Sequence, residues 1–361
     1  MFRIRLSESA MPTGSKDPDV LLAWLLDSMG LVRRKSEGMS IDDEQGALHR
    51  LIRETLLSEP LKGWDTKSLG DVSGLSQTGM HHQLVKLRES GLVAAETEGR
   101  WHIHVLRGGS ISAAVDLVSV QARAILDLRL SEVAEMVTES DDRMVIPSEE
   151  RGGGFQIEIA EPGATIEGED RLDALMRDLG LNGERSKHND RLARQLFEQI
   201  SSSRRAMTLL ALADKTGDSR SRVQRAVERM RAAGIAERVP MLDRIAQDVY
   251  AGLMRQHDAR GEEWLMTRGG LGRLDESVSK SLIAGVRKKS LNIEKVQDIL
   301  APVPLDAQRV LLNTLGGRMP YGIRISGRDG AAVKERVMRQ ADRTLRRLRT
   351  VAQRLDESLA S

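Results

Sequence analysis

Two short segments of this 361-residue chain concentrate side chains that can donate hydrogen bonds to anions. The basic residues of Ser219–Ala233, opposed by a single acid at Glu228, are Arg220, Arg222, Arg225, Arg229 and Arg231. The corresponding residues of Ser76–Ser90 are more mixed and comprise Gln77, Thr78, His81, His82, Lys86, Arg88 and Glu89. Charged side chains hold phosphates without reading sequence, whereas polar side chains can also reach base edges. We therefore expect two unequal anion-binding surfaces, the second holding phosphates more strongly.

The elements that position the first segment can be inferred from local signals. The side chain of Ser76 can cap a helix by accepting a backbone N–H, and Gly74 permits the turn before it. Met80, Leu84 and Leu87 recur at helical spacing and should face a core. Gly91 follows the last apolar residue of the repeat, where a left-handed helix end is expected. The stretch Leu69–Ser90 thus predicts a short helix, a turn and an amphipathic helix.

A β-hairpin is expected after this helix. Leu92 and Val93 open a strand, and Glu98-Gly99 makes a turn. Trp101, Ile103 and Val105 then alternate with polar residues, as in a half-buried strand. The alternating polar residues are Arg100, His102 and His104.

The order helix, turn, helix, hairpin over Leu69–Gly109 resembles the winged helix-turn-helix of ArsR-type and MarR-type bacterial and archaeal transcriptional regulators. The resemblance covers roughly 50 residues. It implies that Ser76–Ser90 is a recognition helix for the DNA major groove and that Glu96–Arg100 is the wing. Metal-sensing members use cysteine, which this chain lacks, so the resemblance does not extend to thiolate metal sensing. A winged helix that binds protein is the alternative.

A second copy follows 143 residues later without a gap. The stretch Leu212–Ile235 repeats Leu69–Leu92, with identical residues at the positions that shape the motif. These pairs are Leu69/Leu212, Asp71/Asp214, Gly74/Gly217, Ser76/Ser219, Arg88/Arg231 and Gly91/Gly234. The repeat predicts a second winged helix and a chain that carries both recognition helices of a regulator dimer.

The second wing is expected to be longer than the first. Trp101 follows Gly91 by ten residues, whereas Trp264 follows Gly234 by thirty, which implies an insertion of 20 residues holding a short helix. Both wings then close on Arg-Gly-Gly, at 107–109 and 268–270. Beyond them, the match of strand 155–159 to strand 321–325 leaves open whether whole halves or only the winged helices are duplicated.

Composition limits the function classes. No cysteine is present, which excludes disulfides and cysteine-based zinc sites and is compatible with a reducing cytoplasm. The net charge is only +2, so local charge must attract nucleic acid. No apolar run approaches the ~20 residues of a membrane span. No catalytic motif is evident, and we expect neither enzyme activity nor a cofactor or metal. A metal site built from His102 and His104 with His81 or His82 is a weak alternative.

The C-terminal segment from about Ala331 predicts a long amphipathic helix with many arginines. Its apolar stripe includes Leu345, Leu348 and Leu355. The stripe either packs on the protein's own core or forms a homodimer, and direct DNA contact by the arginines is a third alternative. A similar helix is expected at about 112–138.

Together these features predict a mainly α fold with small β-wings (α+β). The predicted regions are a disordered leader (1–17), an N-terminal helix with the first winged helix (18–110), a linking region (111–182), a second winged helix (185–275) and a helical C-terminal region (276–361). The predicted function is that of a cytoplasmic, sequence-specific regulator of transcription that binds double-stranded DNA. A replication or chromosome-organisation factor and a protein-binding scaffold are the alternatives. The DNA-binding residues we expect are Ser76, Gln77, Thr78, His81, His82, Lys86, Arg100, Ser219, Arg220, Ser221, Arg222, Gln224, Arg225 and Arg229.

Overall fold

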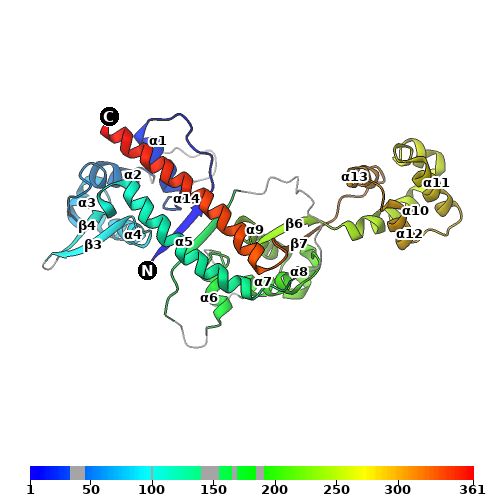
Figure 1. The fold of residues 1–361 in the computed structure, drawn as a ribbon, viewed down its shortest axis with the longest axis horizontal. Helices are drawn as coiled ribbons and strands as arrows, with labels where there is room; N and C mark the ends of the chain where they lie inside the picture. The colour runs from blue at the N-terminus through cyan, green and yellow to red at the C-terminus, as the bar shows by residue number, and fades with distance from the viewer. Residues whose placement is uncertain (33–44, 99–100, 140–153, 165–168, 184–190) are drawn as a thin grey trace.

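The computed structural model describes residues 1–32, 45–98, 101–139, 154–164, 169–183 and 191–361. The protein is mainly helical with small antiparallel sheets (Figure 1). One hydrophobic core runs from Phe2 to Ala236 and is completed by residues from Ile323 to Leu355. A second, smaller core is formed by residues between Ile245 and Leu315. The chain therefore leaves its main core, builds a separate helical module and returns.

The first half of the main body contains two small sheets' worth of strands separated by helices. In chain order its elements are β1 (Arg3–Ser7), α1 (Pro18–Ser28), α2 (Gln45–Leu51), a π-helical turn (Ile52–Leu56), β2 (Trp64–Asp65), α3 (Thr66–Ser73), α4 (Gln77–Glu89), β3 (Val93–Glu98), β4 (Trp101–Leu106), a 3₁₀ turn (Arg107–Gly109) and α5 (Ile111–Glu135). Strands β2, β4 and β3 form one antiparallel sheet in that order. The sheet and the helices α3 and α4 make a compact unit at one end of the molecule (Figure 1).

The second half repeats this order around an insertion. Its elements are β5 (Gln156–Ala160), α6 (Arg171–Asp178), α7 (Leu192–Ser202), α8 (Leu209–Thr216), α9 (Arg220–Ala232), β6 (Ala236–Pro240), β7 (Tyr321–Ile325) and α14 (Gly330–Ala360). The inserted module between β6 and β7 contains α10 (Leu242–Thr267), a 3₁₀ turn (Leu271–Arg273), α11 (Glu276–Arg287), α12 (Ile293–Leu300) and α13 (Leu305–Thr314). Figure 1 shows the module extending away from the main body at the end opposite α3 and α4.

The two halves match residue by residue. Helices α8 and α9 and strand β6 each begin 143 residues after α3, α4 and β3. Past the insertion the offset becomes 219, since β7 ends at Ile325 and α14 begins at Gly330, against Leu106 and Ile111 for β4 and α5. Strand pairing follows the same offsets, with Val93 opposite Leu106 and Ala236 opposite Ile325. The isolated bridge Met207–Ile323 likewise takes the place of the Trp64–His104 pair.

The predicted end of the second hairpin is wrong. Strand β6 pairs with Tyr321–Ile325, and Trp264 lies inside α10 rather than in a returning strand. The Arg-Gly-Gly of 268–270 accordingly follows α10, not a strand. A short match around one tryptophan cannot locate a strand, because pairing is decided by the partner strand across the sheet. The unit predicted to end at residue 275 therefore closes about 50 residues later, after the module.

The predicted disordered leader and the match of 155–159 to 321–325 are also wrong. Residues Arg3–Ser7 form β1, which pairs with β5 in a sheet of its own. Phe2, Ile4 and Leu6 are buried in the main core. Their period-2 alternation is a strand signal, but one strand can be stable only with a partner, which the sequence places about 150 residues away. The counterpart of β5 is therefore β1, and that of β7 is β4.

The long helices α5 and α14 run antiparallel beside each other across the main body (Figure 1). Asp356 near the end of α14 accepts hydrogen bonds from the backbone N–H groups of Ile111 and Ser112 at the start of α5. Leu345, Leu348 and Leu355 are at most 4% exposed in this packing. The apolar stripe of α14 thus serves the chain's own core, and the proposed homodimer through it is wrong because no free seam remains.

One strand of the first hairpin has the opposite orientation to that expected. His104 is buried, whereas Ile103 and Val105 are half-buried and His102 is exposed. Its Nε2 lies 3.5 Å from the hydroxyl of Thr66, at the start of α3. The pairing with β2 imposes this orientation, since Trp64 and His104 face each other.

Candidate nucleic-acid interface

Helix α4 presents a polar, nearly neutral face. The Ser76 side chain accepts a hydrogen bond from the backbone N–H of Gly79, which fixes the helix start as expected. Met80, Leu84 and Leu87 are buried beneath it. The predicted contact residues Gln77, Thr78, His81, His82 and Lys86 are all exposed. The helix N-terminus, with its unpaired N–H groups, is therefore surrounded by hydrogen-bonding side chains that lie open to solvent.

Helix α9 presents a basic face in the equivalent position. The Ser219 side chain accepts from the backbone N–H of Arg222, and Val223, Val227 and Met230 are buried. The predicted contact residues Arg220, Ser221, Arg222, Gln224 and Arg225 are all exposed. Arg222 pairs with Asp218 one turn earlier, which draws its guanidinium toward the helix N-terminus. This face carries three exposed arginines where the face of α4 carries Gln77, Gly79 and His82.

Arg229 does not belong to this face. Its Nε donates to the backbone oxygen of Leu181 at 2.8 Å, and a terminal nitrogen donates to that of Asn182 at 3.2 Å. The side chain is half-buried under the loop that follows α6. Its assignment to DNA binding is therefore withdrawn, because it is held by chain segments that helical periodicity alone cannot reveal. The counterpart Lys86 on α4 is exposed.

The hairpin β3–β4 extends beyond the first unit (Figure 1). Glu96 and Thr97 near its tip are exposed, and Arg100 lies outside the described residues. In the second unit the strands β6 and β7 are joined by the module instead of a short tip, and Arg238 of β6 stacks on Tyr321 of β7 at 4.0 Å. Only the first hairpin can therefore act as a narrow wing.

Two exposed basic residues near these helices were not among the predicted contacts. Arg88 lies on α4 and Arg205 lies just before α8. Arg88 could have been found from its position two residues after Lys86 near the end of a polar helix, whereas Arg205 has no signal in the sequence that distinguishes it from other surface arginines.

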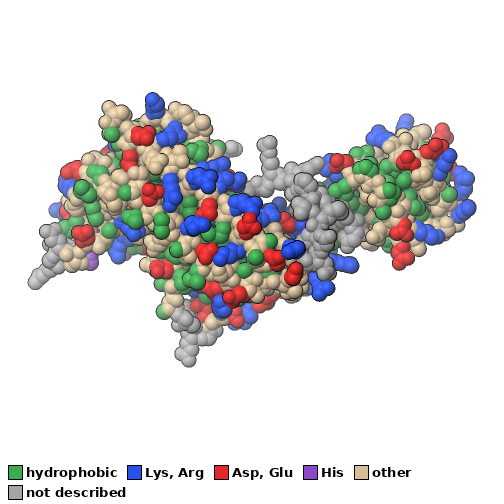
Figure 2. Space-filling view, viewed as in Figure 1, with side chains coloured by type: hydrophobic (Ala, Val, Ile, Leu, Met, Phe, Trp, Pro, Cys, Tyr) green, Lys and Arg blue, Asp and Glu red, His purple; other side chains and the backbone are tan. Residues whose placement is uncertain are grey.

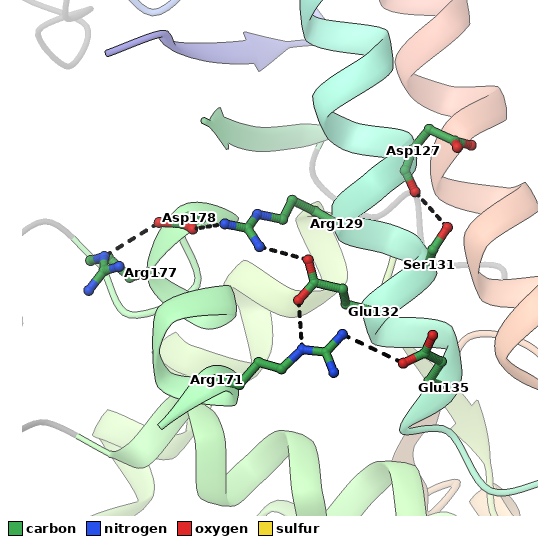
Figure 3. A network of polar contacts seen from close by, with 8 residues as sticks. All are labelled: Asp127, Arg129, Ser131, Glu132, Glu135, Arg171, Arg177 and Asp178. Carbon is green, nitrogen blue, oxygen red and sulfur yellow. Dashed lines mark hydrogen bonds and ion pairs between the residues drawn. The ribbon is translucent and has the colours of Figure 1, made fainter. Parts of the chain in front are cut away.

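A cluster of charged side chains fixes α6 against α5 (Figure 3). Arg129 donates to Glu132 at 2.7 Å and to Asp178 at 2.6 Å, and Glu132 also accepts from Arg171 at 3.0 Å. Burial raises the pKa of Asp178, against the opposing effect of Arg129 and Arg177. For Glu132, burial also raises the pKa, but hydrogen bonds from Arg171 and Arg129 bring it below its usual value. The cluster is structural, since its side chains satisfy one another.

Other kinds of site find little support in the residues that the structure describes. No group of three or more histidine, aspartate or glutamate side chains is arranged to hold a metal ion among them. Within the same residues, no helix has the length and apolar character that a membrane span requires. Comparison of the chain with family models, with curated proteins and with solved structures finds no match.

Proposed function

We propose that the two helix–helix–hairpin units are winged helices and that the protein binds double-stranded DNA through α4 and α9 to regulate transcription. The observation that carries this proposal is the exposure of two equivalent capped helices, each with its N-terminal turns free of covering structure. A winged helix inserts such a helix into the major groove, with its N-terminal residues toward the base edges.

The side chains on the two helices suit different parts of DNA. On α9, Arg220, Arg222 and Arg225 provide charge for the phosphate backbone. On α4, Gln77, Thr78 and His81 provide hydrogen-bonding groups for base edges. The first hairpin would lie beside the groove. Affinity would then come mainly from the second unit and sequence preference mainly from the first.

Binding of the purified protein to duplex DNA at several salt concentrations tests the proposal. If about six phosphates are contacted, the affinity falls roughly 10³-fold between 50 and 200 mM salt. The variant Lys280→Ala serves as a control, because this exposed lysine lies on the module and pairs with Glu276. Absence of binding to mixed-sequence duplex at low salt would contradict the proposal and favour a protein-binding scaffold.

Genome-wide mapping of the bound DNA separates regulation from the alternative role in replication or chromosome organisation. A regulator should be enriched at promoters. Enrichment at origins, or an even distribution along the chromosome, would contradict the regulatory part of the proposal and leave the DNA-binding part intact.

A further inference from the structure

Two pairs of equivalent residues face each other across the molecule. In the sheet β1–β5, Arg5 lies opposite Glu158, which is its counterpart at the offset of 153 residues that relates Phe2 to Phe155. In the helix pair α5–α14, Arg123 Nε lies 2.9 Å from an oxygen of Asp342, its counterpart at the offset of 219. A residue can meet its own counterpart only on a twofold axis. Two such points define the axis.

Contacts away from the axis occur in exchanged pairs, as a twofold axis requires. The backbone N–H of Glu8 donates to the oxygen of Phe155 at 2.7 Å, and that of the counterpart Glu161 donates to Phe2 at 2.9 Å. The two halves are therefore joined as the subunits of a symmetric dimer are joined, although they belong to one chain.

This symmetry determines how α4 and α9 are presented. A tandem repeat related by translation would point its two helices in the same direction along a surface. Rotation by a half turn instead makes α4 and α9 run in opposite directions and turns their exposed faces to the same side of the axis. Duplex DNA has twofold axes perpendicular to its length, so two helices arranged in this way fit successive major grooves in inverted orientation.

We infer that one chain, without a partner copy, binds a single DNA element whose two half-sites are inverted and unequal. This inference rests on the proposed function. The half-sites lie about one helical turn, or ~10 base pairs, apart. They are unequal because the face of α4 is polar and that of α9 is basic. The flanks also differ, since the module occupies at one end the place that the hairpin β3–β4 occupies at the other (Figure 1).

The absence of cysteine allows each half to be located on DNA separately. Asp71 on α3 and Asp214 on α8 are exposed counterparts outside the proposed contact set. The variants Asp71→Cys and Asp214→Cys each receive an iron chelate that cleaves nearby DNA with hydroxyl radicals. The target is a duplex selected by the unmodified protein from a random library, and each labelled variant is first checked for binding to it.

The expected result is one cleavage centre for each variant, about one helical turn apart, with strand patterns related by a half turn. Mass photometry of the unlabelled complex should give one chain per duplex. Cleavage patterns that repeat on the same strand, a single shared centre, unphased cleavage or two chains per duplex would each overturn the inference. If the unmodified protein binds no duplex at all, the proposed function fails instead.

Discussion

The two junctions between helices of the main body occupy equivalent places and use opposite chemistry. At one junction, Arg129 of α5 pairs with Asp178 at the end of α6, and both are buried. At the other, the counterparts are Leu348 of α14 and Ser28 at the end of α1, both completely buried. The backbone arrangement is the same in the two halves, so geometry has been retained while the side chains that stabilise it have changed.

The outer faces of the paired helices differ in the same way. Leu117, Val120 and Leu128 on α5 are between 43% and 63% exposed. Their counterparts on α14 are Arg336, Arg339 and Arg347, which pair with acidic residues of the same chain. Figure 2 shows basic side chains gathered over α14 and hydrophobic side chains over α5 on this face. The duplication therefore specifies the buried contacts, whereas each surface is free to acquire its own character.

The largest expected effect comes from breaking the ionic junction. Arg129→Leu leaves Asp178 buried beside a side chain that cannot pair with it, and the free energy of unfolding should fall by about 3–5 kcal/mol. Adding Asp178→Ser copies the Leu348–Ser28 junction and should restore most of that loss. Urea unfolding of the two variants measures both values. A double variant as unstable as the single one would show that the junctions are not interchangeable.

The next effect separates the two recognition helices. Replacing Arg222 and Arg225 with alanine should weaken binding to all sequences and reduce the salt slope by about one for each lost phosphate contact. Replacing Thr78 and His81 should instead reduce discrimination between sequences, at about 1–3 kcal/mol for each base contact. Competition between the selected duplex and random duplexes distinguishes the two outcomes. Equal behaviour of the two variants would contradict the division of roles.

A smaller effect concerns pH and His104, whose counterpart is the apolar Ile323. Burial lowers the pKa of His104, and Arg88 and His102 lower it further. The unfolded chain, with a histidine pKa near 6.5, therefore takes up the proton more readily, so stability is present above about pH 6.5 and declines as the pH falls below it. His104→Ile should remove this part of the decline between pH 7.5 and 5.5, measured by urea unfolding. The exposed His102→Gln serves as the control, and an unchanged slope in His104→Ile would exclude the buried histidine as its origin.

The smallest effect is expected at the axis itself. Arg123→Ala removes the ion pair with Asp342, whose side chains are 62% and 36% exposed, so the free energy of unfolding should change by less than about 1 kcal/mol. Thermal unfolding at low and high salt measures the change. A loss of several kcal/mol would mean that this pair, rather than the buried helix packing, holds the halves together.

Local patterns were sufficient for much of the fold. Ser76 and Ser219 cap helices as predicted, and the apolar spacing of Met80, Leu84 and Leu87 identified a buried helix face correctly. The expected helices at 277–287 and 293–300 and the strand at 321–325 are present with nearly the same limits. These features depend on interactions between residues three or four positions apart, or on alternation within one strand, which the sequence displays directly.

What only the tertiary structure decided was which distant segments meet. The sequence by itself determined that Ile4 and Leu6 alternate with polar residues, but only the pairing with β5 makes them a strand. Likewise, the return of β7 to β6 across the module and the burial of Arg229 under the loop after α6 depend on contacts between residues far apart in the chain. Strand pairing and helix packing are selected by the total burial of the folded chain, so no single segment carries the information that fixes its partner.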